Sequence, residues 1–499
     1  MKKYLTILVC FFAALIVLFI STSEAATLSN IRYASYPQKV RLVFDFDGQA
    51  YYGLITSEGT LTLAFMSCEV SSYLKKDFEI NDWVIKNVLV NKHGENVIVS
   101  MPILYPVNFT LTPLGSPSRL VVDFGRVFTK SESGGNITQS IKYKRIVKGT
   151  KSGYISAGLL EVDPKKTDIM PVMAKADEPF FKSVVEFFAP WSKGQKKHYY
   201  RERTSSIAKR IGAAGAVNGT YFSYTGRPLG VLMINGEAVS YPISDRTAFI
   251  IGADGQCYID NIIMDSYFEH KGSKYEIIGI NKPRESAKEI VLYNKYYGEL
   301  TETSRLGFEI TVENGKVTGT RIGNSRIPEN GYVLSAGSLY AEQLASVVKI
   351  GDDVGTFLNL IPYSANISNK VAHLVGGGPR LLKGGRVYIS KYEEKFRPDI
   401  AKGRAARTAV GITKNGKILF VTVDGRPRKK IKKKEGFSIG MTLTELAYFM
   451  LSQGAVDALN LDGGSSSTMS INGVVINRPA GGYEQNVSNA IILKPRNTF

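Results

Sequence analysis

The chain has 499 residues, of which 44% are hydrophobic and 21% are charged, and its formal net charge is +19 at pH 7. This is the composition of an ordinary globular protein, and the length is sufficient for about three domains. The chain is therefore neither too small nor too polar to bury a hydrophobic core. The strong positive charge indicates acidic surroundings, such as phosphate-bearing envelope polymers or anionic lipid surfaces.

The N-terminus has the form of a secretory signal. Lys2 and Lys3 precede an apolar stretch over 4–20, and the small residues of STSEAA offer a cleavage site after Ala25. An uncleaved membrane anchor is the alternative, because roughly 17 apolar residues is the lower limit for a spanning helix. We expect residues 1–25 to be a signal peptide and the mature protein to be secreted or associated with the cell envelope, with no membrane span after cleavage.

Cysteine and histidine are scarce. Cys10 lies within the predicted signal, while Cys68 and Cys257 are far apart in the sequence, so a disulfide between them is left open. The four histidines show no spacing typical of metal ligands: His93, His198, His270 and His373. We therefore predict neither a metal site nor a cofactor.

Alternating apolar residues characterise the segment 26–129. In KVRLVFDFDG (39–48) and SRLVVDFG (118–125) apolar residues recur at every second position, which is typical of half-buried strands. The segment resembles the AMIN domain, a small β-sandwich of exported bacterial proteins, and the resemblance implies attachment to the cell wall; a generic β-sandwich is the alternative. The Gly- and Ser-rich stretch that follows predicts a linker over 130–144.

The remaining chain, 145–499, contains two internal echoes. In the first, GAAGAVNG (212–219) and GAVDALNL (454–461) share the pattern Gly-Ala-x-x-Ala-x-Asn. Each follows a helix, and Thr442 with Glu445 forms the Thr-x-x-Glu capping box of the second helix. We expect a helix, a glycine and a strand that ends at an asparagine to occur twice.

In the second echo, RTAFIIGADG (246–255) matches RTAVGITKNG (407–416), so that an Arg-Thr-Ala strand twice reaches an Asp-Gly or Asn-Gly hairpin turn. Between the echoes, about 265–370, lies a mostly β insertion with a hairpin around Asn314-Gly315. Three consecutive glycines follow it, including Gly377, where the backbone either approaches a ligand closely or makes a tight turn.

These pieces predict the fold class α+β, an N-terminal all-β sandwich followed by a mixed α+β domain with the β insertion. The insertion would form a lid or lengthen the sheet. Strands of the larger domain would end at a common edge and carry Asn218, Arg407 and Asp462 into loops.

Seven motifs occur in the order seen in the phosphodiester glycosidase family: AVNGTYF (216–222), GGGPRLL (376–382), RTAVGI (407–412), VDGR (423–426), GMTLTELAYFM (440–450), NLDGGSSST (460–468) and GYEQNVSNAIIL (482–493). The resemblance implies that an exported bacterial protein hydrolyses the bond between a sugar's anomeric carbon and a phosphodiester. The chain departs from the family at Glu484-Gln485, where Glu-Arg is common. One expected positive charge is therefore missing, and Arg478 is a candidate to replace it.

A carboxylate is the first requirement of this chemistry, because glycosyl transfer passes through an oxocarbenium-like state that two carboxyl groups usually serve. We predict Asp462 as the first catalytic carboxylate and Glu484 or Asp424 as the second. Since the leaving group is a phosphate monoester, already a stable anion, a positive clamp matters more than its protonation, and Arg407 is the candidate for gripping phosphate oxygens.

The other predicted contacts lie in loops. Backbone N–H groups of Gly463 and Gly464 and the Ser465 hydroxyl would face developing charge, and Asn218 and Asn460 would position sugar hydroxyls. The predicted substrate-binding set also includes three further residues: Gly219, Gly377 and Arg478. Each assignment has a structural alternative, because an aspartate or asparagine beside glycine often only builds a turn.

The same sequence argues against a serine hydrolase and against nucleic-acid binding. A serine hydrolase would need a Gly-x-Ser-x-Gly elbow, which is absent because Thr468 follows the three serines. Nucleic-acid binding is not expected, because a signal exports the chain and no recognition motif accompanies the charge. The alternative to an enzyme is a non-catalytic envelope protein that binds anionic glycopolymer, with the basic run RPRKKIKKKEG (426–436) either contributing or serving only as a solvated loop. We predict a hydrolase of sugar phosphodiesters in envelope or extracellular glycopolymers, held at the cell wall by the N-terminal domain.

Overall fold

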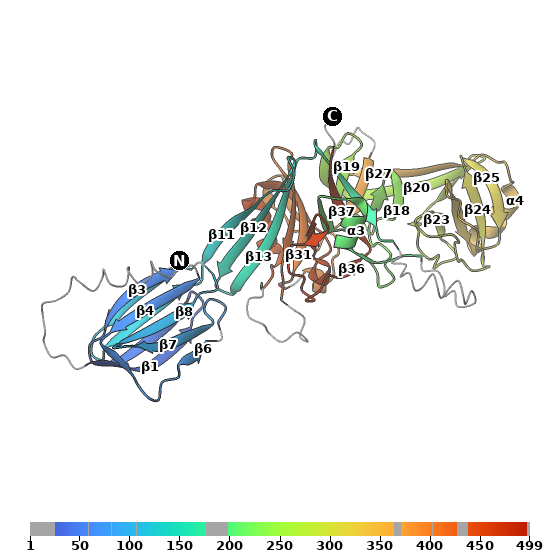
Figure 1. The fold of residues 1–499 in the computed structure, drawn as a ribbon. Helices are drawn as coiled ribbons and strands as arrows, with labels where there is room; N and C mark the ends of the chain where they lie inside the picture. Colours follow the sequence, from blue (N-terminus) through green and yellow to red (C-terminus); the bar gives the residue numbers. More distant parts are fainter. Residues whose placement is uncertain are drawn as a thin grey trace, which may run out of the picture. The chain divides into compact units, whose positions relative to one another are not determined.

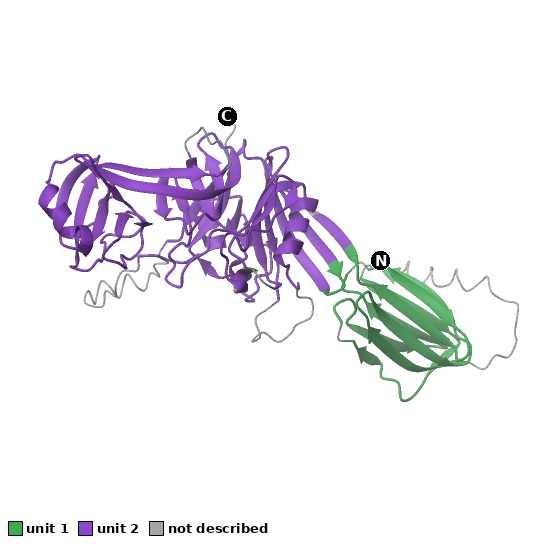
Figure 2. Ribbon diagram, turned by 180° about the vertical axis from the view of Figure 1, so that it is seen from behind, with its two compact units in different colours: residues 1–128, 149–152 green, residues 129–148, 153–499 purple. Residues whose placement is uncertain are grey.

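The fold is seen in a computed structural model that describes residues 25–496 except 58, 81, 106, 176–197, 364–370, 402 and 427–437. The predicted signal before residue 25 and the basic run after Arg426 therefore lie outside the described residues. The chain forms two compact units, residues 1–128 with 149–152 and residues 129–148 with 153–499 (Figure 2). Within the described ranges, no helix is both long and apolar enough to cross a membrane.

Unit 1 consists of two five-stranded sheets around one apolar core (Figure 1). The first has the order β5 (Cys68–Val70), β1 (Ala26–Ser35), β2 (Lys39–Asp47), β10 (Arg119–Gly125) and β9 (Phe109–Leu114). The second has the order β3 (Tyr51–Ser57), β4 (Thr60–Met66), β8 (Asn96–Pro102), β7 (Asn87–His93) and β6 (Asp77–Glu79). The alternation in β2 and β10 is confirmed, because Leu42 and Phe44 of β2 and Leu120 and Val122 of β10 are buried in this core.

Unit 2 is built on an eight-stranded sheet. Its order is β11 (Phe128–Asn136), β12 (Ile141–Thr150), β13 (Gly153–Val162), β32 (Ile418–Val423), β31 (Arg407–Thr413), β33 (Ala455–Asn460), β29 (Arg380–Lys383) and β30 (Arg386–Val387). The stretch 130–144, predicted as a linker, instead contributes to β11 and β12 at the edge of this sheet. The Gly and Ser residues there mark a hairpin rather than a free connection.

Two further sheets share a core with the eight-stranded sheet. One has the order β14 (Thr167–Met173), β37 (Asn489–Pro495), β16 (Gly215–Asn218), β34 (Met469–Ile471) and β35 (Val474–Val475). The other has the order β18 (Glu237–Ser240), β17 (Leu232–Ile234), β28 (Val371–Gly376), β19 (Thr247–Gly252), β20 (Cys257–His270) and β21 (Ser273–Glu276), with β27 (Gly355–Pro362) paired to β20. Val217, Phe249, Val375, Val410 and Ile491 meet in this core, so strands far apart in the sequence are fixed against one another.

The insertion carries a separate five-stranded sheet with the order β22 (Gly279–Ile280), β23 (Ile290–Asn294), β26 (Gly331–Gly337), β24 (Gly307–Glu313) and β25 (Lys316–Arg321). The long strands β20 and β27 lead to and from it (Figure 1). Asn314 and Gly315 have φ values of 51° and 76°, which confirms the predicted hairpin turn between β24 and β25. A two-stranded pair, β15 (Glu202–Arg203) with β36 (Asn486–Val487), completes the unit.

Among the described residues of unit 2, helices are few and short: α3 (Thr204–Ile211), α4 (Ser338–Val347), α5 (Pro398–Ala401) and α6 (Leu443–Ser452). The prediction of a mixed α+β domain is therefore wrong, and the described chain is β-rich. The helix–glycine–strand echoes are confirmed as α3–Gly212–β16 and α6–Gly454–β33, and the Thr442–Glu445 capping box is present. The error lay in extending these two helical segments to the whole domain, because most of the chain between them alternates with the period of a strand.

Candidate functional site

Strand ends from two sheets meet at one edge of unit 2. Strand β16 ends at Asn218, β33 ends at Asn460, and β31 begins at Arg407. After β33 the chain passes through Asp462 into a single 3₁₀ turn, η2 (Gly464–Ser466). The Asp462 N–H donates to the Gly219 carbonyl at 3.4 Å. This hydrogen bond joins the ends of the two similar segments, 212–219 and 454–461.

The Asn218 side chain holds this junction together. Its Nδ2 donates to the Asp462 carbonyl at 2.7 Å, and its Oδ1 accepts from Thr408 Oγ1 at 2.7 Å and from the Thr468 N–H at 3.1 Å. The residue is only 1% exposed. Asn218 therefore bridges backbone and side-chain groups within the protein, as an asparagine with a purely structural role does. It positions the Asp462 loop rather than facing a sugar.

The Asp462 carboxyl group has no charged partner among the described side chains. Burial raises its pKa from an ordinary value of 3.8 to about 7, against the opposing effect of hydrogen bonds from the Ser466 side chain and the Gly463 N–H. A carboxyl group with this pKa exchanges a proton near neutral pH, which is the property of a general acid or base.

Tyr221 is a site residue that the sequence reasoning missed. Its hydroxyl donates to the Gly378 carbonyl at 2.8 Å and accepts from Asn460 Nδ2 at 2.9 Å. Burial raises the pKa of Tyr221, and the nearby Asp462 charge raises it further, so the hydroxyl stays protonated. The sequence feature that could have identified Tyr221 is its position in the motif AVNGTYF, three residues after Asn218.

Asn460 is fixed by these contacts rather than open to solvent. Its Nδ2 also donates to the Gly378 carbonyl at 3.1 Å and to the Leu461 carbonyl at 2.8 Å. Its Oδ1 is buried and has no hydrogen-bond partner among the described residues. Asn460 therefore couples the predicted glycine loop to the residue before Asp462.

Arg407 lies beside the Asp462 loop. A Cβ atom added to Gly463 would lie 3.7 Å from the Arg407 Cα, and Arg407 is 4% exposed. Its guanidinium donates to three carbonyls, those of Met441 (3.1 Å), Ile400 (3.1 Å) and Gly403 (3.0 Å). Burial lowers its pKa, and no described carboxylate forms an ion pair with it. Among the described residues, the buried Arg407 guanidinium is thus held by carbonyl dipoles.

The two other predicted carboxylates have separate partners. Glu484 accepts hydrogen bonds from the Ser205 N–H, at 2.8 Å, and from the Ser205 hydroxyl, which places it at the N-terminus of α3. Asp424 accepts from the Arg478 N–H at 2.8 Å and from Asn477 Nδ2 at 3.2 Å, and burial raises its pKa. Neither carboxylate is among the groups that bind Asp462.

The glycines act mainly through shape. A Cβ at Gly219 would lie 1.9 Å from Asn489 Oδ1, and a Cβ at Gly377 would lie 2.6 Å from the Asn460 carbonyl oxygen, so neither position has room for a side chain. The Gly464 N–H donates to the Ala406 carbonyl at 2.9 Å rather than pointing into free space. Ser465 lies in η2 and is partly exposed, which leaves its hydroxyl among the candidates for substrate contact.

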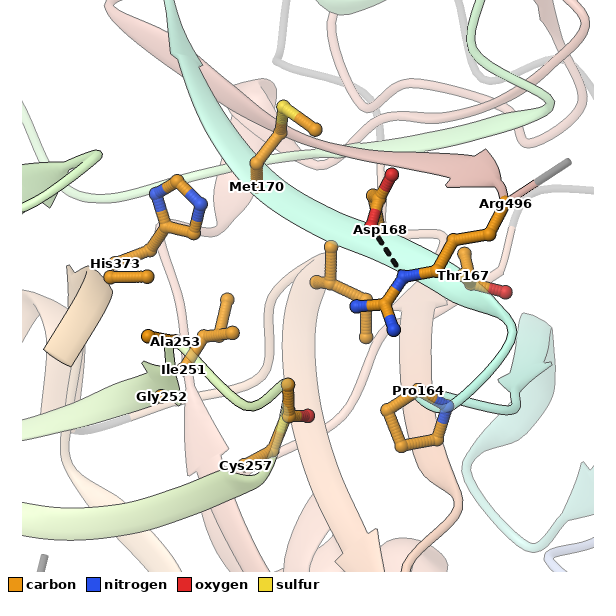
Figure 3. A pocket seen from close by; sticks show the side chains of 13 residues that line it. Pro164, Thr167, Asp168, Met170, Ile251, Gly252, Ala253, Cys257, His373 and Arg496 are labelled. Atoms are coloured by element: carbon orange, nitrogen blue, oxygen red, sulfur yellow. Dashed lines mark hydrogen bonds and ion pairs between the residues drawn. The ribbon is translucent and has the colours of Figure 1, made fainter. Parts of the chain in front are cut away.

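A small cavity of about 150 Å³ lies against β14, β19, β20 and β28 and beyond the end of β37 (Figure 3). Asn218 pairs with Ala490 of β37, whereas Asp168 pairs with Lys494 of β37, so the cavity is at the other end of the β14–β37–β16 sheet from Asn218. It is lined by residues that include Asp168, Cys257, His373 and Arg496. Asp168 and Arg496 are joined by a 2.6 Å ion pair. The cavity includes none of the predicted site residues. Across the described residues, no three His, Cys, Asp or Glu side chains are grouped to hold a metal ion, and Cys68 and Cys257 are free thiols.

Comparisons with known proteins assign a class to the C-terminal part. Residues 307–494 match the model of the phosphodiester glycosidase family. This segment contains Arg407, Asn460 and Asp462, whereas Asn218 and Tyr221 precede it. Residues 307–494 are therefore similar to a phosphodiester glycosidase domain, and the structure brings Asn218 and Tyr221 from outside this match to the same place.

Particular relatives are distant. N-acetylglucosamine-1-phosphodiester alpha-N-acetylglucosaminidase of Bos taurus is 30% identical over 128 residues, covering 24% of this chain and 23% of the bovine protein. The match thus spans about a quarter of each. A hypothetical protein from Synechocystis has a TM-score of 0.59 at 21% identity, covering 99% of this chain and 85% of that one. A putative exported protein from Burkholderia pseudomallei K96243 has a TM-score of 0.54 at 16% identity, covering 95% of this chain and 97% of that one. These two structures show that the fold is shared.

Proposed function

We propose that the protein is an exported bacterial glycosidase that hydrolyses the bond between a sugar's anomeric carbon and a phosphodiester. The observation that carries the proposal is Asp462, a desolvated carboxyl group with a pKa of about 7, placed inside the segment that matches the phosphodiester glycosidase family. The name of the bovine relative, which acts on a sugar 1-phosphodiester, supports the same substrate class.

One carboxyl group is sufficient in this scheme. The phosphate leaves as an anion without prior protonation, so no general acid is needed on its side of the sugar. Asp462 in its charged form takes a proton from water as the water oxygen bonds to the anomeric carbon. The second carboxylate of ordinary glycosidases is then dispensable, consistent with Glu484 and Asp424 being bound elsewhere.

The surroundings of Asp462 serve this step. Asn218 fixes the Asp462 carbonyl, and the Ser466 side chain and the Gly463 N–H orient the carboxylate. The Arg407 guanidinium supplies positive charge beside the loop, where a phosphate group would gain charge-assisted hydrogen bonds. Envelope or extracellular glycopolymers are the proposed source of the substrate, and unit 1 is the proposed attachment to the cell wall.

The test is sugar release from a panel of sugar 1-phosphodiesters by purified protein, with the variant Asp462→Asn alongside. We expect release by the native protein and its loss in the variant. The matched control is Asp168→Asn, which removes a carboxylate from the cavity at the other end of the β14–β37–β16 sheet. Binding of anionic glycopolymer without release from any substrate would replace the enzyme with a binding protein.

A further inference from the structure

The second echo in the sequence places two arginines around one tyrosine. Arg407 begins β31, and Arg246 occupies the matching position just before β19. Arg246 Nε donates to the Glu394 carbonyl at 3.1 Å, and its Nη2 donates to the Lys395 carbonyl at 3.3 Å. Like Arg407, Arg246 is held by main-chain carbonyls rather than by a carboxylate.

The carboxylate of Glu394 does not neutralise Arg246 directly. One of its oxygens accepts from Thr247 Oγ1 at 2.6 Å and also from the Ser390 hydroxyl, and the other accepts from the Thr247 N–H at 3.1 Å. Within the described residues, Arg246 and Glu394 form no ion pair. Burial lowers the pKa of Arg246 more than the Glu394 charge raises it, as expected for a cation that lacks a close counter-ion.

Aromatic packing connects Arg246 to the site. Its guanidinium lies over the Phe396 ring at 4.0 Å, and the Phe396 and Tyr221 ring centroids are 5.9 Å apart. The Tyr221 hydroxyl in turn binds Asn460, two residues before Asp462. Arg246 and Arg407 both act electrostatically on Tyr221, as Asp462 does. Arg246 and Arg407, which have carbonyl partners but no ion-pair partner among the described residues, therefore both act on Tyr221. The Tyr221 hydroxyl is bound to Asn460, close in sequence to the candidate catalytic Asp462.

Such cations are costly to bury unless an anion joins them, because an arginine that lacks a counter-ion loses hydration without Coulombic compensation. The reaction proposed above supplies an anion whose charge grows. The bond from the anomeric carbon to the phosphate oxygen breaks, and its electron pair stays on that oxygen. The water oxygen bonds to the carbon and its proton passes to Asp462. The phosphate thereby changes from a diester with one negative charge to a monoester with two.

We propose that Arg246 and Arg407 form one phosphate subsite that binds a monoester dianion more tightly than a diester monoanion. The inference rests on the proposed function and assigns to Arg246 a role in recognising the leaving group. A subsite of this kind stabilises charge that develops in the transition state. It also retains the phosphate product, which makes a phosphate monoester a competitive inhibitor.

The experiment compares binding of methyl phosphate and dimethyl phosphate to the full chain at pH 8 by titration calorimetry, with no sugar present. We expect methyl phosphate to bind at least about tenfold more tightly than dimethyl phosphate. Arg246→Met should remove most of this preference, and Arg246→Lys should keep part of it. The matched control is Arg284→Met, because Arg284 likewise donates to a main-chain carbonyl, that of Leu306, and in addition to the Ser335 hydroxyl, but lies in the insertion.

The outcomes separate this proposal from the reaction itself. Equal affinities for the two probes, or an unchanged preference in folded Arg246→Met, would overturn the subsite even if sugar is released. A preference that depends on Arg246 but not on Arg284 supports the subsite even if no sugar substrate in the panel is cleaved. If both probes bind and neither Arg246 substitution changes their affinity, the subsite would also be overturned, because such binding would reflect the positive charge of the protein surface in general.

Discussion

Two regions of unit 2, at opposite ends of the β14–β37–β16 sheet, each contain an aspartate and an arginine, but the charges are unpaired in one region and form an ion pair in the other. At one end, Arg407 is buried and Asp462 is partly buried, and each lacks an ion-pair partner among the described residues. At the other end, Asp168 and Arg496 pair at 2.6 Å, and each side chain is 42% exposed. Charges that are paired and hydrated cost little, whereas unpaired buried charges reduce stability and persist where they serve a purpose. The comparison supports the proposal that the functional site is at the Asp462 end rather than at the end with this cavity.

The largest expected effect comes from Asp462→Asn. Removing a general base should lower the rate of sugar release by roughly a hundredfold to ten-thousandfold. Asp168→Asn, at the opposite end, should leave the rate within about twofold, since an exposed ion pair contributes little. Steady-state kinetics of both variants on one substrate measure the contrast. Equal losses in the two variants would remove the distinction between the ends.

The same substitution should change how stability depends on pH. The folded Asp462 carboxyl keeps its proton up to about pH 7, whereas the unfolded carboxyl loses it near its ordinary pKa of 3.8. The folded state thus binds more protons between these values, and the free energy of unfolding falls as pH rises through this window. Asp462→Asn lacks this loss, so its advantage over the native protein should grow to about 2–4 kcal/mol by pH 8. Urea denaturation at pH 4 and pH 8 measures it; a difference independent of pH would contradict the desolvated state of Asp462.

Glu484 sharpens the comparison between paired and unpaired charges. It belongs to one of the family motifs, but its carboxylate is bound by Ser205. Glu484→Ala removes the group that binds the Ser205 N–H at the start of α3 and should cost about 1 kcal/mol of stability. The folded variant should retain sugar release. Thermal unfolding and kinetics on the same sample test both parts. A loss of release beyond about a hundredfold at unchanged stability would instead make Glu484 a catalytic carboxylate.

The smallest effect is expected at the paired end. Arg496→Met breaks the ion pair with Asp168, and the free energy of unfolding should fall by less than about 1 kcal/mol. Raising the salt concentration should reduce even this difference, because both groups are exposed and screened. Denaturation at low and high salt gives the measurement. A loss of several kcal/mol would show that the pair is not the hydrated contact described here.

The sequence predicted local structure well where a short motif carries its own physics. The capping box of Thr442 and Glu445 and the alternation in β2 needed no distant partner, and both are confirmed. Strands were expected to carry Asn218, Arg407 and Asp462 into loops. Asp462 does follow β33 in a loop, whereas Asn218 is the last residue of β16 and Arg407 is the first residue of β31.

Roles that depend on long-range pairing were not predictable. The partner of Glu484 is Ser205, 279 positions away, and no local pattern links them. The sequence alone does not distinguish Tyr221 from other buried tyrosines, because its contacts with Gly378 and Asn460 depend on the three-dimensional structure. The fold class failed for a related reason, because two capped helices produce strong local signals, whereas the many short strands become a sheet only through partners elsewhere in the chain.

The central claim is that Asp462 acts as a base with a pKa of about 7, and the pH dependence of sugar release tests it most directly. The logarithm of kcat/KM for one sugar 1-phosphodiester should rise with pH up to about 7 and then level off, with this dependence absent from any residual activity of Asp462→Asn. A rate that falls through the same range would assign Asp462 as an acid. A flat profile shared by both proteins would remove Asp462 from the reaction.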